Sequence, residues 1–227
     1  SISGGEISQI KEIISGIDLI GACIGHVRLD KVNIGSDIKP GNLVIGLAST
    51  GVHSNGLTLA RKVLLGDSFD EQKSRVNDYE EFLGQTLGEA LLKPTRIYVQ
   101  PIIEMLDKGI DLKAMVHITS GGFCNLNRVA CNNIRFVIDT LQPVPEIFNL
   151  IQDRGGVSEA EMFEVFNMGT GFCLVVEGLK EVEAITEICK QHDLPCQVIG
   201  QIEASQGKEV SLPTKQLIGK GSKFTVS

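Results

Sequence analysis

Three glycine-containing loops carry the residues of this sequence that are best suited to chemistry. They are 49–56 (STGVHSNG), 117–123 (HITSGGF) and 166–171 (FNMGTG). Each combines glycines with hydroxyl or amide side chains and lies next to a predicted strand. Small residues let backbone N–H groups converge on an anion, and a helix N-terminus adds a favourable dipole. Loops of this kind can bind phosphate without a large positive charge.

Side chains in the loops can add hydrogen-bond donors to these backbone groups. Ser54, Asn55, Thr119 and Asn167 are such donors, and His53 can contact a phosphate or a polar substrate group. The alternative is that each loop is only a tight turn with good helix capping, since Ser, Thr, Asn and Gly are favoured caps. Three such loops in one chain favour a ligand site over three separate turns.

Other nucleotide and metal signatures are missing from the sequence. No G-x-x-x-x-G-K-[ST] segment occurs, no G-x-G-x-x-G opens a helix after a strand, and no H-E-x-x-H is present. Outside the loops, Thr95 and Arg96 can bring a guanidinium to a phosphate, or Arg96 can form a surface salt bridge. Glu6 follows a glycine pair that can expose it near a ligand, although a solvated loop carboxylate is the better interpretation of Glu6 taken alone.

The elements that must position these loops follow from the hydrophobic pattern. The pattern predicts an α/β fold, an α+β sandwich in which helices alternate with strands. Strands are predicted at 18–27, 42–49, 114–119, 134–138, 172–177 and 196–202, with short antiparallel pieces in 210–226. Helices are predicted to follow Gly56, to run from Pro94 to Gly109, and to cover 180–192, while 67–79 is predicted as an exposed loop.

Composition sets the limits within which these loops act. The 227 residues are 42% hydrophobic and carry a net charge of −7, so we expect a globular protein without a broad cationic face for nucleic acid or a membrane. No apolar window reaches the roughly 18 residues of a membrane span. The six cysteines never form C-x-x-C, which favours reduced thiols and a cytoplasmic location. The chain begins at Ser1 without Met, as if another segment preceded it.

Six segments, in order, resemble the phosphoribosylformylglycinamidine cyclo-ligase (aminoimidazole ribonucleotide synthetase) family. They are GGE at 4–6, DLIGACIGHV at 18–27, GLASTGVHSNG at 46–56, LLKPTRIYVQ at 91–100, HITSGGF at 117–123 and MFEVFNMGTGF at 162–172. The resemblance implies the family's C-terminal domain, with split βαβ units and helices packed on a mixed sheet. It divides the chain into a remnant of an N-terminal ATP-binding and dimerisation domain at 1–34 and the C-terminal domain at 35–227.

The resemblance also implies a reaction. ATP, with Mg²⁺, phosphorylates the formamide oxygen of formylglycinamidine ribonucleotide, and a nitrogen then attacks that carbon and expels phosphate, which gives aminoimidazole ribonucleotide in purine biosynthesis. His53 and Asn55 match catalytic positions, and Glu6 matches a cleft carboxylate. Substrate- or phosphate-binding positions match at Ser54, Gly56, Thr95, Arg96, Thr119, Gly121, Gly122, Asn167 and Gly169.

The departures from the family pattern define the remaining expectations. About 130 family residues, the size of one domain, precede Gly4 in the family and hold ATP and the metal, so we expect no metal ligand in this chain and no activity from the chain alone. The expected partners are a small ribonucleotide and either the missing segment or a second copy. Because Ile7, Gln9 and Lys11 stand where the family has Thr, a second acid and Pro, and Ser120 replaces a glycine, a non-catalytic binding or assembly module remains an alternative, as does another ATP-using member of the superfamily.

Overall fold

The computed structural model describes residues 4, 5 and 20–226, which fall into two units, Ser1–Val32 and Asn33–Ser227. In the first unit, the one regular element among the described residues is the 3₁₀ helix η1 (Leu29–Lys31). The strand predicted at 18–27 is not formed over residues 20–27, because the described part of the chain supplies it with no hydrogen-bonding partner strand. Asp18, Leu19 and Glu6 lie outside the described residues.

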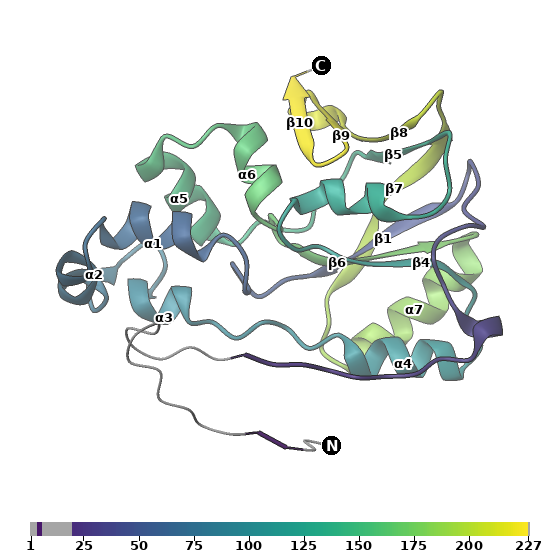
Figure 1. The fold of residues 1–227 in the computed structure, drawn as a ribbon, viewed down its shortest axis with the longest axis horizontal. Coiled ribbons are helices and arrows are strands. Elements are labelled where there is room, and N and C mark those ends of the chain that lie inside the picture. Colours follow the sequence, from purple (N-terminus) through teal and green to yellow (C-terminus); the bar gives the residue numbers. More distant parts are fainter. Residues whose placement is uncertain (1–3, 6–19, 227) are drawn as a thin grey trace. The chain divides into compact units, whose positions relative to one another are not determined.

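A large mixed sheet forms the centre of the second unit (Figure 1). Within the described residues its eight strands lie in the order β10-β9-β8-β5-β7-β1-β6-β4. All neighbouring pairs are antiparallel except β5 and β8, which are parallel. The bounds are β1 (Leu43–Ala48), β4 (Leu112–His117), β5 (Ile134–Ile138), β6 (Thr170–Val176), β7 (Cys196–Ala204), β8 (Lys208–Leu212), β9 (Leu217–Lys220) and β10 (Lys223–Val226). The α/β fold class with helices on a mixed sheet is thereby confirmed.

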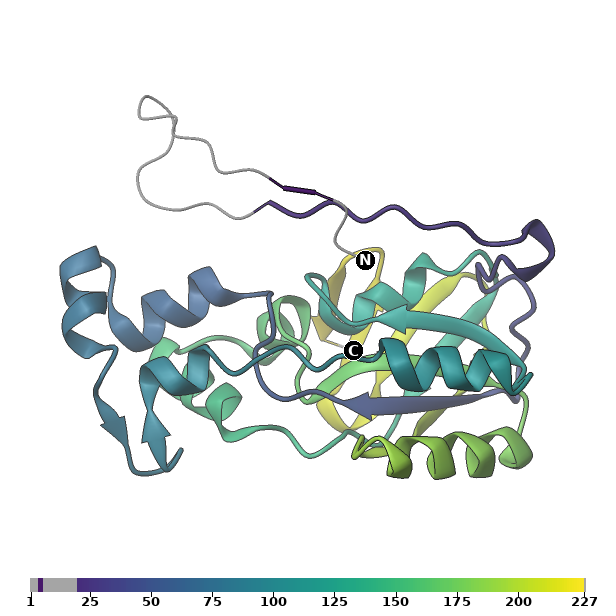
Figure 2. The same ribbon diagram turned by 90° about the horizontal axis from the view of Figure 1, so that it is seen from below.

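Helices connect the strands and cover the sheet. They are α1 (Leu57–Leu65), α2 (Phe69–Arg75), α3 (Leu87–Leu91), α4 (Val99–Asp107), α5 (Glu146–Gly155), α6 (Glu159–Val165) and α7 (Leu179–Gln191), with 3₁₀ helices η2 (Gly122–Arg128) and η3 (Pro213–Lys215). A separate hairpin is formed by β2 (Tyr79–Glu80) and β3 (Gln85–Thr86). In Figure 2, α4 and α7 lie side by side along the sheet, in agreement with the contacts between them.

The strands bury side chains on both faces of the sheet. In β1, Val44 belongs to one apolar cluster, whereas Ile45 and Leu47 belong to another. The same alternation occurs in β6, where Val175 and Leu174 lie in different clusters. Since successive side chains of a strand point to opposite faces, each cluster fills one side of the sheet. Helices α4 and α7 close one side, and α1, α3, α5, α6 and η2 close the other.

Two further predicted elements differ from the structure. The helix predicted from Pro94 begins instead at Val99, because the residues from Pro94 to Ile97 form no helix and are held by hydrogen bonds to the loop after β1. Pro101 occupies the first turn of this helix, where an amide has no partner within the helix. The exposed loop predicted at 67–79 contains α2, which begins with a capping box between Ser68 and Glu71.

The order of three central strands decides where the glycine loops lie. Strand β6 pairs with β1 on one side and with β4 on the other, antiparallel to both. The carboxyl ends of β1 and β4 therefore lie at the same edge of the sheet as the amino end of β6. All three loops begin or end at this edge. No helix among residues 20–226 is long and apolar enough to cross a membrane.

Candidate functional site

The three loops are joined directly by hydrogen bonds. The side-chain amide of Asn167 donates to the carbonyl of Gly51 at 2.8 Å, which connects the loop before β6 to the loop after β1. The amide of Ser49 donates to Gly169 at 2.8 Å, and the amide of Ile118 donates to Gly171 at 2.9 Å. The 166–171 segment thus holds the other two loops, and the structure brings the three sequence-predicted segments together.

His53 lies inside the first loop in a left-handed backbone conformation, with φ of 60°. The residue is only 6% exposed. Its Nε2 accepts a hydrogen bond from the amide of Thr50 at 3.1 Å and a longer one from the amide of Arg96 at 3.5 Å. Because Nε2 is an acceptor, the proton of the neutral ring lies on Nδ1. Burial, together with the positive charges of His117 and Arg96, lowers the pKa of His53 to about 4, so the ring is neutral at pH 7.

The segment before α4 lies against this first loop. The hydroxyl of Thr50 donates to the carbonyl of Pro94 at 2.6 Å. The hydroxyls of Ser54 and Thr95 are hydrogen-bonded at 3.1 Å. Ser54 is exposed and Thr95 is half-buried, so their hydroxyls share one accessible position beside the loop. The segments 49–56 and 91–100, which carry separate motifs of the sequence, are therefore in direct contact in the structure.

Arg96 and Tyr98 fix the same segment from its other side. A terminal guanidinium nitrogen of Arg96 donates to the carbonyl of Asp193 at 3.0 Å. The hydroxyl of Tyr98 donates to the carbonyl of Ala48, the last residue of β1, at 2.9 Å. Burial raises the pKa of Tyr98 far above its ordinary value, so its hydroxyl keeps the proton that it donates. Arg96 is thus turned toward the protein, and its guanidinium bonds to a backbone carbonyl rather than to a carboxylate.

The second loop is stabilised by Asn125, a residue that the sequence did not single out. Its side-chain oxygen accepts from both the amide and the hydroxyl of Thr119, each at 2.9 Å. Its side-chain nitrogen donates to the carbonyl of Ser120 at 3.0 Å. Asn125 is 1% exposed. The sequence signal that could have identified Asn125 is its spacing. It lies six residues after Thr119 and three after the glycine pair, so that η2 can fold back and bring its side chain to the loop.

The glycines of the second loop pack against α6. The amide of Gly121 donates to the carbonyl of Glu164 at 2.8 Å, and the amide of Gly122 donates to Thr119 at 2.9 Å. A Cβ at Gly122 would lie 1.8 Å from the carbonyl oxygen of Phe163, so only glycine fits there. Thr119, Gly121 and Gly122 therefore use their amides within the protein.

The third loop is similarly occupied by internal bonds. The amide of Gly169 donates to the side-chain oxygen of Asn167 at 3.0 Å, and Thr170 donates to the Asn167 carbonyl at 2.9 Å. Asn167 is 3% exposed. By contrast, His53 and Ser54 form a turn, and the structure assigns no acceptor among the described residues to the amides of Gly51 to Ser54 and of Gly56. These amides precede α1, which starts at Leu57 after a Gly56 that offers no side-chain cap.

Buried polar atoms without a partner gather at this edge of the sheet. Of five such side-chain atoms among the residues that the structure describes, four come from the loops and the Arg96 segment. They are Ser49 Oγ, His53 Nδ1, Arg96 Nε and Thr170 Oγ1. Leaving a buried polar group unpaired costs about 1–3 kcal/mol, so such groups are rare in a folded protein and call for an explanation. Their concentration at one place indicates a site that takes a polar ligand or ordered water.

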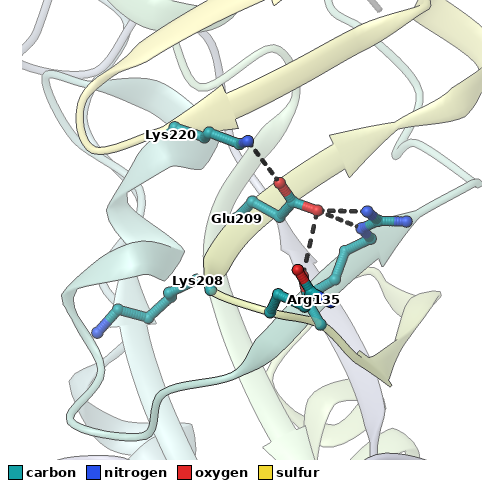
Figure 3. Close-up of a pocket in the computed structure, with 7 residues that line it drawn as sticks. Arg135, Lys208, Glu209 and Lys220 are labelled. Carbon is teal, nitrogen blue, oxygen red and sulfur yellow. Dashed lines mark hydrogen bonds and ion pairs between the residues drawn. The ribbon is translucent and has the colours of Figure 1, made fainter.

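A second polar pocket lies among β5, β8 and β9. The charged side chains that line it are bonded to one another or to the backbone. Figure 3 shows Glu209 of β8 between Arg135 of β5 and Lys220 of β9. Glu209 accepts from Arg135 Nε at 2.6 Å and from Ser205 at 3.4 Å. Burial raises the pKa of Glu209, but the two cations outweigh it and the net shift is downward. Because its charges are paired, this pocket is a structural ion-pair network.

Metal ligands are not grouped in the described part of the chain. No three residues of the types His, Cys, Asp and Glu lie close enough together there to hold a metal ion. The loops instead offer hydroxyls, amides and a neutral histidine. Hard cations such as Mg²⁺ prefer carboxylate oxygens, so the described residues do not fit a magnesium site.

Comparison with known proteins gives the family. The C-terminal domain of AIR synthase related proteins matches residues 39–213. The chain belongs to this family. The match includes all three loops and the segment before α4.

Curated relatives in this family are named phosphoribosylformylglycinamidine cyclo-ligase. The relative from Methanococcus maripaludis is 42% identical over 95% of this chain, and that match covers 59% of the relative. The relative from Methanocaldococcus jannaschii is 43% identical over 89% of this chain and 56% of its own length. The relative from Methanothermobacter thermautotrophicus is 40% identical over 93% of this chain and 60% of its own length. The chain thus spans somewhat over half the length of these relatives.

Solved structures give weaker similarities. One is the hydrogenase maturation protein HypE, with a TM-score of 0.49, 12% identity, and coverage of 89% of this chain and 57% of that chain. Another is Thermotoga maritima PurL complexed with FGAR, with a TM-score of 0.47, 15% identity, and coverage of 83% and 28%. The family assignment rests on the sequence match alone.

Proposed function

We propose that this chain is the C-terminal portion of a phosphoribosylformylglycinamidine cyclo-ligase. The complete enzyme would use ATP to convert formylglycinamidine ribonucleotide to aminoimidazole ribonucleotide in purine biosynthesis. The observation that carries the proposal is the cluster of unpaired buried polar atoms at the three loops, in a chain whose named relatives are 40–43% identical. The domain division at residues 34 and 35 and a cytoplasmic location belong to the same proposal.

The chemistry requires activation of an amide oxygen. Transfer of the γ-phosphoryl group of ATP to the formamide oxygen releases ADP and creates a leaving group, and attack by nitrogen on the same carbon then expels phosphate and closes the ring. Phosphoryl transfer depends mainly on positioning and on stabilising charge. A loop of free amides at a helix N-terminus suits such a task better than a set of acid and base side chains.

Within this scheme the Gly51–Gly56 loop is the phosphate-binding element. Its amides and the N-terminus of α1 would bind an anionic oxygen, and the Ser54 and Thr95 hydroxyls would add donors at its edge. Asn55, half-buried in the same loop, would contribute its amide to the reacting groups. The loop's glycines permit the close approach, and Gly56 keeps a φ of 77° that leads directly into α1.

The other predicted residues have supporting roles in the proposal. His53 would act as a neutral hydrogen-bond group, since two backbone amides already occupy its Nε2. Thr119, Gly121 and Gly122, with Asn167 and Gly169, would hold the substrate side of the cleft in shape through their internal bonds. Arg96 would add positive potential near the loop while its guanidinium stays bonded to Asp193.

ATP and Mg²⁺ are expected to be held mainly by family residues outside this match. No described residue cluster fits the metal, so no step here depends on it. The remaining partner is the N-terminal segment that the longer relatives contain, or a second copy of the chain. The proposal therefore assigns ring-closing activity to the complete enzyme rather than to these 227 residues.

The test is a chimera. The segment that precedes the matched region in the Methanococcus maripaludis relative is fused to this chain, and formation of aminoimidazole ribonucleotide is followed with ATP and formylglycinamidine ribonucleotide. The matched variants are Asn55→Ala, in the open loop, and Asn77→Ala, an exposed position between α2 and β2. We expect product from the chimera and its Asn77→Ala variant, and at least a roughly tenfold loss with Asn55→Ala, as for removal of one donor from a charge-stabilising site.

A folded chimera with no product would contradict the proposal. If it still bound ATP and the ribonucleotide in calorimetry, the binding or assembly module would be favoured. If it turned over ATP with a different phosphoryl acceptor, another ATP-using member of the superfamily would be favoured. Equal activity of the Asn55→Ala and Asn77→Ala chimeras would remove Asn55 from the site.

A further inference from the structure

Two cysteines lie together where α7 ends and β7 begins. Cys189 is in the last turn of α7 and is fully buried, whereas Cys196 is the first residue of β7 and is partly exposed. Both belong to the apolar cluster between α7 and the sheet. They are separated by the turn that contains Asp193 and Pro195. Neither residue belongs to the loop site described above.

The contacts of Cys196 place its thiol against the face of α7 that carries Cys189. The sulfur of Cys196 lies 4.0 Å from the hydroxyl of Thr186. Thr186 is three residues before Cys189 on α7, and side chains at this spacing share one helix face. Cys189 and Cys196 also pack in the same apolar cluster, and Cys189 lies one helical turn from Thr186. The sulfur of Cys196 therefore faces α7 at the position where Cys189 emerges.

The two thiols differ in acidity, and this difference favours oxidation of Cys196 before Cys189. The Cys189 thiol lowers the pKa of Cys196 below that of an ordinary thiol, and the Thr186 hydroxyl acts in the same direction. The Cys196 thiol, together with burial, raises the pKa of Cys189. Cys196 is thus the more acidic thiol of the two and, being partly exposed, the more accessible one. An accessible thiolate with an adjacent thiol is the arrangement found in reversible redox sites.

We infer that Cys196 and Cys189 form a peroxide-reactive dithiol, in which Cys196 is oxidised first and Cys189 resolves it to a disulfide. In the first step the Cys196 thiolate attacks one oxygen of a hydroperoxide, the O–O bond breaks, and the products are the sulfenic acid and hydroxide or alkoxide. In the second step the Cys189 sulfur attacks the Cys196 sulfur, the S–O bond breaks, and water leaves with the thiol proton. Two thiols are oxidised and the hydroperoxide is reduced.

The dithiol is connected to the loop site through the turn between its members. The carbonyl of Asp193 in this turn accepts from Arg96, and the amide of Arg96 donates to His53. Leu194 also donates to the carbonyl of Cys189 at 2.9 Å, which fixes the turn to α7. A disulfide across the turn would restrain Asp193 and, through it, the Arg96 segment.

The test treats the purified protein with hydrogen peroxide near stoichiometric amounts, blocks remaining thiols, and digests it with trypsin. Lys190 lies between the two cysteines, so cleavage separates the peptide 181–190 from the peptide 191–208. We expect these two peptides to remain linked, with the loss of two hydrogen atoms, and to separate after reduction. Cys189→Ser should instead leave Cys196 as a sulfenic acid that a carbon-acid reagent traps.

The control is Cys131→Ser, which removes another partly exposed thiol whose sulfur contacts the carbonyl of Ile38. This variant should form the linked peptides as the unchanged protein does. Oxidation of Cys131 or Cys23 while Cys196 remains free would overturn the inference, as would oxidation of Cys196 to sulfinic acid without linkage. Unfolding temperatures of the variants, measured before treatment, show that each reports on a folded protein.

Discussion

The hydroxyl of Tyr98 occupies the space that a side chain at Gly171 would fill. A Cβ built on Gly171 would lie 2.0 Å from this hydroxyl oxygen and 2.8 Å from Cε1 of His53. Tyr98 can therefore reach the carbonyl of Ala48 only because residue 171 has no side chain. Neither residue was selected from the sequence as part of the site, although both fall within motifs that the resemblance used.

Gly171→Ala should lower stability by about 1–3 kcal/mol, because the methyl group would displace Tyr98 and the ring of His53 in a packed region. Urea unfolding measures the change in free energy. Gly178→Ala is the matched control, since a Cβ there would contact nothing within 4 Å. The double variant Gly171→Ala with Tyr98→Phe should recover part of the loss. An equal loss in both glycine variants would contradict this packing argument.

Asn167→Ala should destabilise the protein by about 1–3 kcal/mol, since it removes the donor to Gly51 and the acceptor from Gly169 and leaves both backbone groups unpaired in a buried place. Asn149→Ala is a suitable comparison, because Asn149 is exposed on α5 and its side chain bonds only to Glu146 in the described part of the chain. Hydrogen exchange should show faster exchange at Gly169 in Asn167→Ala. Unchanged exchange there would mean that Asn167 does not hold the loop.

The buried His53 should make stability depend on pH. Its pKa falls from 6.5 to about 4 on folding, so the unfolded chain binds more protons between these values. Stability should therefore decrease as pH falls through this window, and His53→Gln should show a shallower decrease. NMR titration of the ring checks the pKa directly. A His53 resonance that titrates near its ordinary pKa of 6.5 in the folded protein would show that the ring is solvated.

The ion pairs of Glu209 should stabilise the folded protein at pH values above the ordinary carboxyl pKa. This stabilisation should be lost when the carboxylate is protonated in acid. Burial opposes the charge, but the partners Arg135 and Lys220 hold the pKa below its usual value, so the folded state keeps its carboxylate at a pH where the unfolded chain is protonated. Glu209→Gln should flatten the acid limb of the stability curve, measured by urea unfolding at a series of pH values. An acid limb that stays as steep in Glu209→Gln would contradict this prediction.

Most of the sheet could be predicted from the sequence because its strands alternate or run apolar between turns. The strand at 134–138 has the predicted bounds, and the helix predicted at 180–192 differs from α7 by one residue at each end. Short polar helices were harder to predict from the sequence. Helix α2 depends on a capping box rather than on an apolar face, and the residues from Pro94 to Ile97 follow tertiary hydrogen bonds in place of their helical pattern.

Only the local features of the candidate site could be predicted from the sequence. Glycines and small polar residues mark the loops, so His53, Asn55 and Asn167 could be selected from spacing. Which loop keeps free amides depends on contacts between distant segments, such as the bond from Gly121 to Glu164, and no local pattern contains that information. The assignment of the open loop to Gly51–Gly56 therefore required the fold, and the roles of its residues stay predictions.

The position of β6 between β1 and β4 has a consequence for folding. The bond from Asn167 to Gly51 joins residues 116 positions apart, so the chain must close a long loop before the first and third loops can meet. The polar edge is thus assembled only after the central strands have paired. Any ligand that needs all three loops would bind the folded domain and not its partly folded forms, and its binding would raise the unfolding temperature of the whole sheet.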